Sequence, residues 1–85
     1  MDRNIMFYAV FDYDDDPISI YFPDLPGCFS CGSSTEEAMT MAKEALDLYL
    51  EDMKEDEIPR ANPYEEIKAK GLNQRIFPIK TSRKR

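Results

Sequence analysis

The side chains of this sequence that could do chemistry are a group of aspartates near the N-terminus, two cysteines and ten Phe and Tyr residues, while histidine is absent. Without histidine the chain lacks the commonest general base and the commonest zinc ligand. It also has no Ser-His or Cys-His pair for nucleophilic catalysis. The composition therefore argues against most classes of enzyme, and we expect no catalytic residues and no cofactor.

The carboxylate group that best suits a divalent metal consists of Asp12, Asp14, Asp15, Asp16 and Asp24. Two-metal nuclease sites need several carboxylates that converge from rigid elements, whereas four of these five belong to one turn. The group also lacks the glycine and the terminal glutamate of a calcium loop. We therefore predict no metal site and favour a docking role toward a basic partner. A small metal-dependent nuclease that uses this turn stays open as an alternative.

Cys28 and Cys31 form a C-x-x-C pair. A closed zinc site would need four thiolates and hence two chains, and a redox pair usually lies at the start of a helix. On a strand, a separation of three residues places the two side chains on opposite faces. We interpret the pair as two unrelated thiols, with a redox pair and a metal shared between two chains as alternatives, and we expect no disulfide.

The charge is distributed unevenly along the chain. Positions 1–72 hold all 17 acidic residues and six basic ones, a balance of −11, whereas positions 73–85 hold five basic residues and no acidic one. The acidic part suits a basic partner and repels a phosphate backbone, so we expect no DNA binding by these 85 residues. No apolar run approaches the roughly 18 residues that cross a bilayer, and no signal-type N-terminus is present. These features predict a cytoplasmic protein without membrane contact.

The hydrophobic pattern predicts an α+β fold, with an antiparallel sheet of three to four strands and one long helix on one face, in the order β-β-β-α-β. Strands are expected at residues 5–13, 18–22, 28–32 and 75–79. Pro78 confines the last strand to an edge or an end of the sheet. We expect one domain at residues 1–80, followed by a basic tail at 81–85.

The long helix has a clear start, because Ser34 can cap it with Glu37 as the capping-box partner. Its predicted apolar stripe consists of Ala38, Met41, Ala42, Ala45, Leu48 and Tyr49, widened by Leu46 and Leu50. The helix should end near 53–54. A second, short helix is expected from Tyr64 to Lys70, with Asn62 as its cap and Gly71 as its stop. The sheet face away from the long helix must then be polar or form an interface.

Between the second and third strands lies Phe22-Pro23-Asp24-Leu25-Pro26-Gly27-Cys28. Two prolines and a glycine cannot continue a strand or begin a stable helix. The segment is therefore a structured turn that holds the apolar side chain of Leu25 in its middle. We treat Pro23, Leu25, Pro26 and Gly27 as its structural motif.

Residues 6–63 resemble the HicB antitoxin family. The resemblance rests on FPDLPGC at 22–28, EEA at 36–38, AKEALDLYL at 42–50 and IP at 58–59. It implies a partial RNase H-like fold and the function of a type II antitoxin, which binds and neutralises HicA, a small basic toxin that cleaves messenger RNA. It names no catalytic residues. HicB proteins usually continue into a C-terminal DNA-binding segment, and a naturally short member and a fragment both stay open.

For contact with a HicA-like RNase toxin we select the acidic residues of the two turns and two aromatic anchors on the sheet face away from the helix. These residues are Asp14, Asp15, Asp16, Asp24, Tyr8 and Tyr21. Ordinary exposed strand residues are the alternative for the two tyrosines. Exposed edge strands also lead us to expect a homodimer or a higher oligomer, and an orphan dimerisation module without a toxin stays open.

Overall fold

The computed structural model describes residues 4–67 and 71–84. Its elements are β1 (Asn4–Asp12), β2 (Ile18–Tyr21), β3 (Phe29–Gly32), the helix α1 (Thr35–Glu51), two 3-10 turns, η1 (Glu55–Glu57) and η2 (Tyr64–Glu66), and β4 (Gln74–Lys84). Within the described ranges, no helix combines the length and the apolar character that crossing a membrane requires.

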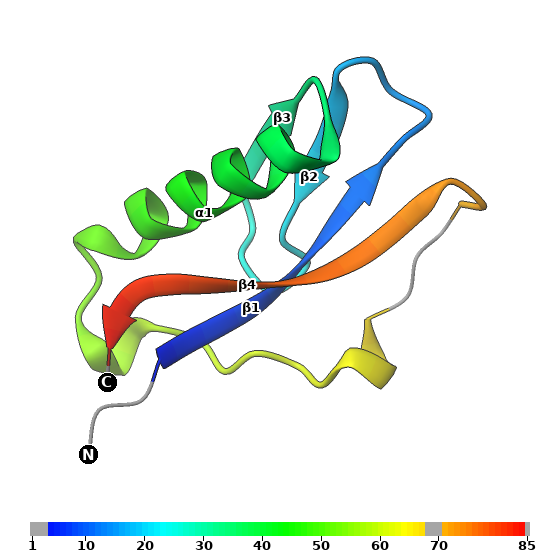
Figure 1. Ribbon diagram of the computed structural model, residues 1–85. Helices are drawn as coiled ribbons and strands as arrows, with labels where there is room; N and C mark the ends of the chain where they lie inside the picture. Colours follow the sequence, from blue (N-terminus) through cyan, green and yellow to red (C-terminus); the bar gives the residue numbers. More distant parts are fainter. Residues whose placement is uncertain (1–3, 68–70, 85) are drawn as a thin grey trace.

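The four strands form one antiparallel sheet in the order β3-β2-β1-β4 (Figure 1). β1 is central, because Phe11 pairs with Ile20 of β2 and Phe7 pairs with Ile79 of β4. β4 is an edge strand, and its Pro78 lies opposite Tyr8. The predicted α+β class and the edge position of Pro78 are both confirmed.

α1 covers one face of the sheet and buries one row of side chains against it (Figure 1). The buried helix residues repeat every four positions and are Ala38, Ala42, Leu46 and Leu50. They meet the aromatic and branched side chains of the strands, among which Phe7, Phe11 and Ile20 are at most 1% exposed. Burial of each such large side chain stabilises the fold by about 1.5–3 kcal/mol. The predicted stripe is wrong at Leu48, which is 71% exposed.

The start of α1 has the predicted N-cap at Ser34, but the expected capping box does not form, because the Glu37 side chain binds the amide of Ser33 and not that of Ser34. The Glu37 amide donates to Ser34 Oγ over 3.1 Å, and the Glu37 carboxylate accepts from the Ser33 amide over 2.9 Å. These two bonds satisfy amide groups that have no partner within the helix. α1 ends at Glu51, slightly earlier than predicted.

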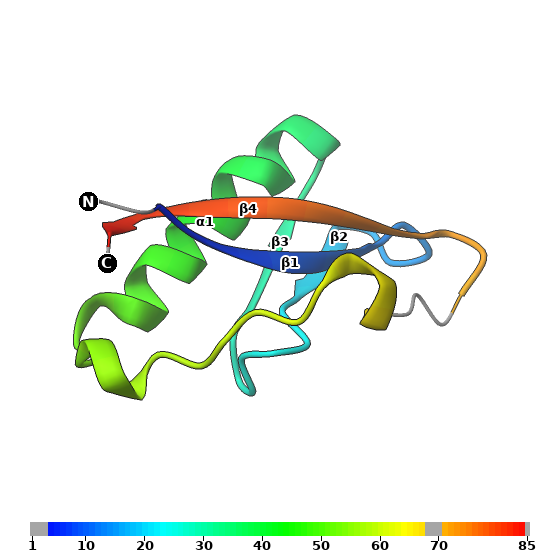
Figure 2. The ribbon, with the colours of Figure 1, turned by 90° about the horizontal axis from the view of Figure 1, so that it is seen from below.

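The other face of the sheet is crossed by the chain between η1 and η2, which lies on the side opposite α1 (Figures 1 and 2). The predicted second helix is wrong within the described residues, because only the single turn η2 forms and Ile67 is already extended. Asn62 does not cap it, since its side chain and backbone amide bind Asp24 instead. The remaining positions of that prediction, 68–70, lie outside the described residues.

β4 is longer than predicted and runs past residue 80 into the part expected to be a basic tail. Two groups at its end donate to Asp47 Oδ1 of α1, namely Thr81 Oγ1 over 2.5 Å and the Ser82 amide over 2.8 Å. Lys43 Nζ donates to Asp47 Oδ2 over 2.7 Å. Burial alone would raise the pKa of Asp47, but these hydrogen bonds and the charge of Lys43 lower it to about 2. Asp47 therefore joins the helix to the last strand as a carboxylate.

Candidate functional site

The turn between β2 and β3 is closed around the side chain of Leu25, which is only 1% exposed. The Leu25 amide donates to the Phe22 carbonyl, and the Cys28 amide donates to the Leu25 carbonyl, both over 3.0 Å. Gly27 has a φ of +84°, a backbone conformation in which a side chain is strained. The two prolines and this glycine thus fix a loop that a strand could not form.

The same turn is held from two sides of the molecule. From α1, the Tyr49 hydroxyl donates to the Pro26 carbonyl over 2.9 Å. From the segment before η2, the Asn62 amide donates to Asp24 Oδ2 over 2.9 Å, and Asn62 Nδ2 donates to Asp24 Oδ1 over 2.5 Å. The turn is therefore the place where the helix, the sheet and the crossing segment are connected.

A pocket of about 500 Å³ opens beside this turn, and we call it the turn pocket. Its wall includes the residues of the turn, the strand residues Tyr21 and Phe29, and Asn62, Glu66 and Ile67 from the crossing segment. Tyr21 and Phe29 are cross-strand partners, so both side chains stand on the face away from α1. Phe29 is 69% exposed. The turn pocket thus combines aromatic surface with one carboxylate from each of two segments.

The predicted acidic contact residues fall into two separate places. Asp14, Asp15 and Asp16 are exposed in the turn between β1 and β2, whereas Asp24 lies at the opposite end of β2 (Figure 1). Asp14 Oδ1 accepts from Asn73 Nδ2 over 2.6 Å, and Asp15 Oδ2 accepts from Ser19 Oγ over 2.5 Å. Among the residues that the structure describes, no three His, Cys, Asp or Glu side chains could hold a metal ion together. No observation therefore favours the nuclease alternative.

The two predicted tyrosine anchors lie on the expected face but in different surroundings. Tyr8 is half-buried, and its ring meets the ring of Tyr64 from η2 edge-on, with 5.7 Å between the centroids. Tyr21 lines the turn pocket. Tyr8 therefore already takes part in the contact between the sheet and the crossing segment, whereas Tyr21, which is also half-buried, forms part of the pocket wall.

The two cysteines are free and face opposite sides, as the strand alternation predicts. Cys28 is buried, and its Sγ lies 3.8 Å from the Ala45 carbonyl of α1. Burial raises the pKa of the Cys28 thiol to about 11, which keeps it protonated and unreactive near neutral pH. Cys31 is exposed.

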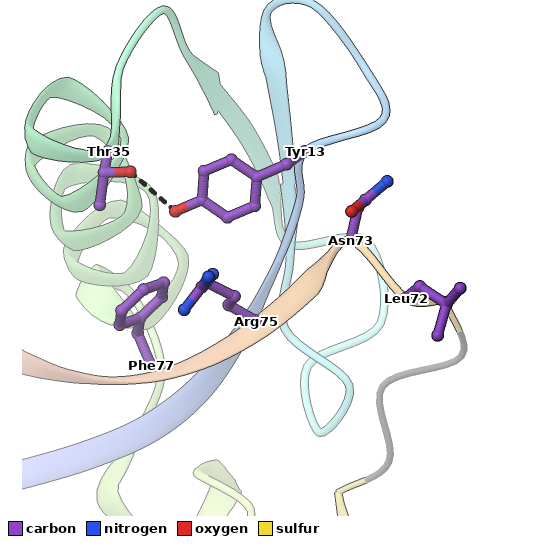
Figure 3. A pocket seen from close by; sticks show the side chains of 6 residues that line it. All are labelled: Tyr13, Thr35, Leu72, Asn73, Arg75 and Phe77. Carbon is purple, nitrogen blue, oxygen red and sulfur yellow. Dashed lines mark hydrogen bonds between the residues drawn. The ribbon is translucent and has the colours of Figure 1, made fainter.

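A second pocket, of about 530 Å³, lies between the first turn of α1 and the start of β4 (Figure 3). The Arg75 side chain extends into it near the rings of Tyr13 and Phe77, and the Tyr13 hydroxyl lies 2.8 Å from Thr35 Oγ1. Arg75 forms no ion pair with a carboxylate of the described residues. The ion pair among those residues joins Lys43 and Asp47, outside this pocket. The sequence did not indicate this pocket, because its walls come from three distant segments.

Sequence reasoning also missed Phe29 and Glu66 as members of the turn pocket. The strand register offered a signal for Phe29, because its partner Tyr21 was already selected for the open face. Glu66 had no such signal, because its place depends on how the segment after α1 returns across the sheet.

The family model described as the HicB-like antitoxin of bacterial toxin-antitoxin systems matches residues 7–77. An uncharacterized 14.9 kDa protein in the rep-hol intergenic region of Haemophilus phage HP1 is 46% identical over 54 residues, which make up 61% of this chain and 41% of that protein. Antitoxin HicB 2 of Photorhabdus laumondii is 35% identical over 63 residues, covering 69% of this chain and 45% of that protein. The chain thus spans less than half the length of these two relatives.

The solved structures include a similar fold. A chain of the structure described as "HicA3 and HicB3 toxin-antitoxin complex" superposes with a TM-score of 0.70, covering 93% of this chain and 100% of that chain. The sequence identity of the pair is 19%, so the similarity concerns the fold.

Proposed function

Because this chain belongs to the HicB-like antitoxin family of bacterial toxin-antitoxin systems, we propose that it binds a small basic RNA-cleaving toxin and neutralises it by occlusion. The observation that carries the proposal is the family match over residues 7–77, which includes β2, β3, all of α1 and most of β1, together with the start of β4. The balance of −11 over positions 1–72 supports it, because such a surface attracts a basic protein.

We assign the acidic and aromatic residues different parts in this binding. Asp14, Asp15 and Asp16 are exposed and raise the association rate with a basic toxin by electrostatic steering. Asp24 acts indirectly, because its carboxylate is occupied by Asn62 and fixes the wall of the turn pocket. Tyr21 contributes aromatic contact area at that pocket, and Tyr8 supports the crossing segment through Tyr64.

The proposal makes this chain a binding protein and not an enzyme, with no cofactor and no role of its own in DNA binding. We place it in the cytoplasm, where messenger RNA is translated, and we propose a homodimer formed through an edge of the sheet. The strand order is consistent with the partial RNase H-like arrangement that the family resemblance implies.

The test is co-expression of the tagged 85-residue chain with the small basic protein encoded beside its gene, followed by purification at low and at high salt. We expect a stable complex that suppresses RNA cleavage by the toxin. The triple variant Asp14→Asn, Asp15→Asn, Asp16→Asn should bind with a lower association rate and a weaker salt dependence. Absence of a complex at both salt concentrations would overturn the antitoxin function, and magnesium-dependent RNA cleavage by the chain alone would favour the nuclease alternative.

A further inference from the structure

We propose that the turn pocket binds one basic side chain, a lysine or an arginine, that the toxin presents to it. This inference rests on the proposed function, and it identifies where on the molecule the partner is held and which chemical group the site recognises. Two residues carry it, Phe29 and Glu66, neither of which is used elsewhere in the fold's core.

The pocket lies beside the turn between β2 and β3, and its wall includes the first residue of the edge strand β3. β3 is the outermost strand on that side, and its first residue, Phe29, keeps 69% of its surface exposed. Phe29 and its cross-strand partner Tyr21 stand on the same face of the sheet. Aromatic rings attract ammonium and guanidinium groups through the negative charge density of their faces. The two rings therefore provide a surface that suits a cation with an aliphatic stem.

The charge of the pocket also selects for a cation. Glu66 lies on its wall and is exposed, and within residues 4–67 and 71–84 no side chain donates a hydrogen bond to its carboxylate. Asp24, in contrast, already has both oxygens occupied by Asn62. The carboxylate ready to pair with an incoming charge is thus Glu66, and the surrounding balance of −11 adds to the attraction.

The walls of the pocket are fixed before a partner arrives. Leu25 is buried beneath the turn, Tyr49 binds the Pro26 carbonyl from α1, and Asp24 binds Asn62 from the crossing segment. A pocket whose walls are already ordered loses little conformational entropy on binding. Its volume of about 500 Å³ is sufficient for one long side chain.

The test is isothermal titration of the full chain with the purified toxin, using two pocket variants and two matched controls. Phe29→Ser removes the exposed ring, and Leu48→Ser is its control, because Leu48 is 71% exposed but lies on α1 at the other face. Glu66→Gln removes the charge, and Glu65→Gln removes the same charge one residue away, outside the pocket. Thermal unfolding of each variant checks that the fold is retained.

We expect Phe29→Ser to raise the Kd about tenfold and Glu66→Gln about fivefold, while each control stays within about twofold of the wild type. If the wild type binds the toxin and both pocket variants bind equally well, the inference is overturned while the antitoxin function stands. If the wild type itself forms no complex, the antitoxin function fails and the inference fails with it.

The other possible occupant of the turn pocket is a second copy of this chain, and sedimentation distinguishes it from the toxin. Sedimentation of the wild type and of Phe29→Ser gives the oligomeric state of each. A dimer that Phe29→Ser dissociates, together with an unchanged Kd for the toxin, would assign the turn pocket to self-association and overturn the inference.

Discussion

The two faces of the sheet are covered in different ways. On one face, α1 lays a continuous row of side chains over the strands, and Leu46 and Leu50 are fully buried there. On the other face, a segment with two short 3-10 turns crosses the strands and is attached at a few points, chiefly Asp24 with Asn62 and Tyr8 with Tyr64.

This difference lies in the kind of contact that covers each face. The helix-covered face depends on close packing of apolar groups, in which every side chain touches several others and a change is costly. The crossed face buries fewer apolar side chains, among them Val10 and Ile67, and it leaves aromatic and charged groups at the surface. The partner binding that we propose for the second face would therefore leave the packing of the first unchanged.

The largest expected effect tests the helix-covered face. Leu46→Ala should lower the free energy of unfolding by about 3 kcal/mol, because it leaves a cavity in a fully packed layer. Ile67→Ala on the crossed face should cost about half as much, since that layer is thinner and can close over the lost group. Urea unfolding of both variants measures the difference, with Leu48→Ala as the exposed control. Equal losses in the free energy of unfolding for Leu46→Ala and Ile67→Ala would contradict the view that the two faces are packed differently.

The next effect concerns the join between α1 and β4. Asp47→Asn should lower the free energy of unfolding by about 1–2 kcal/mol near neutral pH, because it removes charge-assisted hydrogen bonds from Lys43, Thr81 and Ser82. The pKa of Asp47 in the folded state, about 2, lies below the ordinary value of about 3.9. The contribution of the carboxylate is therefore complete above the ordinary value and is lost as the pH falls toward about 2.

Urea unfolding of the wild type and of Asp47→Asn over a series of pH values checks this expectation. The stability gap between the two proteins should narrow as the pH falls from about 4 toward about 2. Glu44→Gln, a change at an exposed position of the same helix, should have the same free energy of unfolding as the wild type at every pH. A gap of constant size for Asp47→Asn would mean that the side chain acts by its shape and not by its charge.

The smallest effect sharpens the description of the crossed face. Asp24→Ala removes both acceptors of Asn62 and should cost about 1 kcal/mol. The loss should be local, so hydrogen exchange should accelerate at the backbone amides of 62–67 and not in α1. Asp56→Ala, an exposed acidic residue of η1, is the control. Equal acceleration throughout the chain would show that the crossing segment belongs to the same cooperative unit as the helix-covered face.

The parts of the fold that local chemistry dictates were predictable from the sequence. The cap at Ser34 with Glu37 and the alternation that places Cys28 inside and Cys31 outside need only neighbouring residues. The choice of Leu48 as a core residue was wrong because the helical period allows several apolar stripes. The rotation of α1 about its own axis, which decides among them, is set by the sheet beneath it.

The parts that distant residues decide were not predictable. Asn62 was expected to cap a helix, but its partner Asp24 lies 38 residues earlier and draws it into a different contact. β4 was expected to end near residue 79, yet its pairing with β1 and the contacts of Thr81 and Ser82 with Asp47 carry it to Lys84. The turn pocket was missed for the same reason, since Glu66 reaches it only through the returning segment.

The central position of β1 affects how the sheet can fold during synthesis. Of the strands in this sheet, the central β1 is synthesised first and its neighbour β4 last, and Phe7 of β1 pairs with Ile79 of β4. Contacts so far apart along the chain slow folding, because a long loop must close before they form. During synthesis on the ribosome, the side of β1 that pairs with β4 therefore stays unpaired until residues 74–84 have been made. The order of the strands thus sets a delay between the synthesis of β1 and the completion of the sheet.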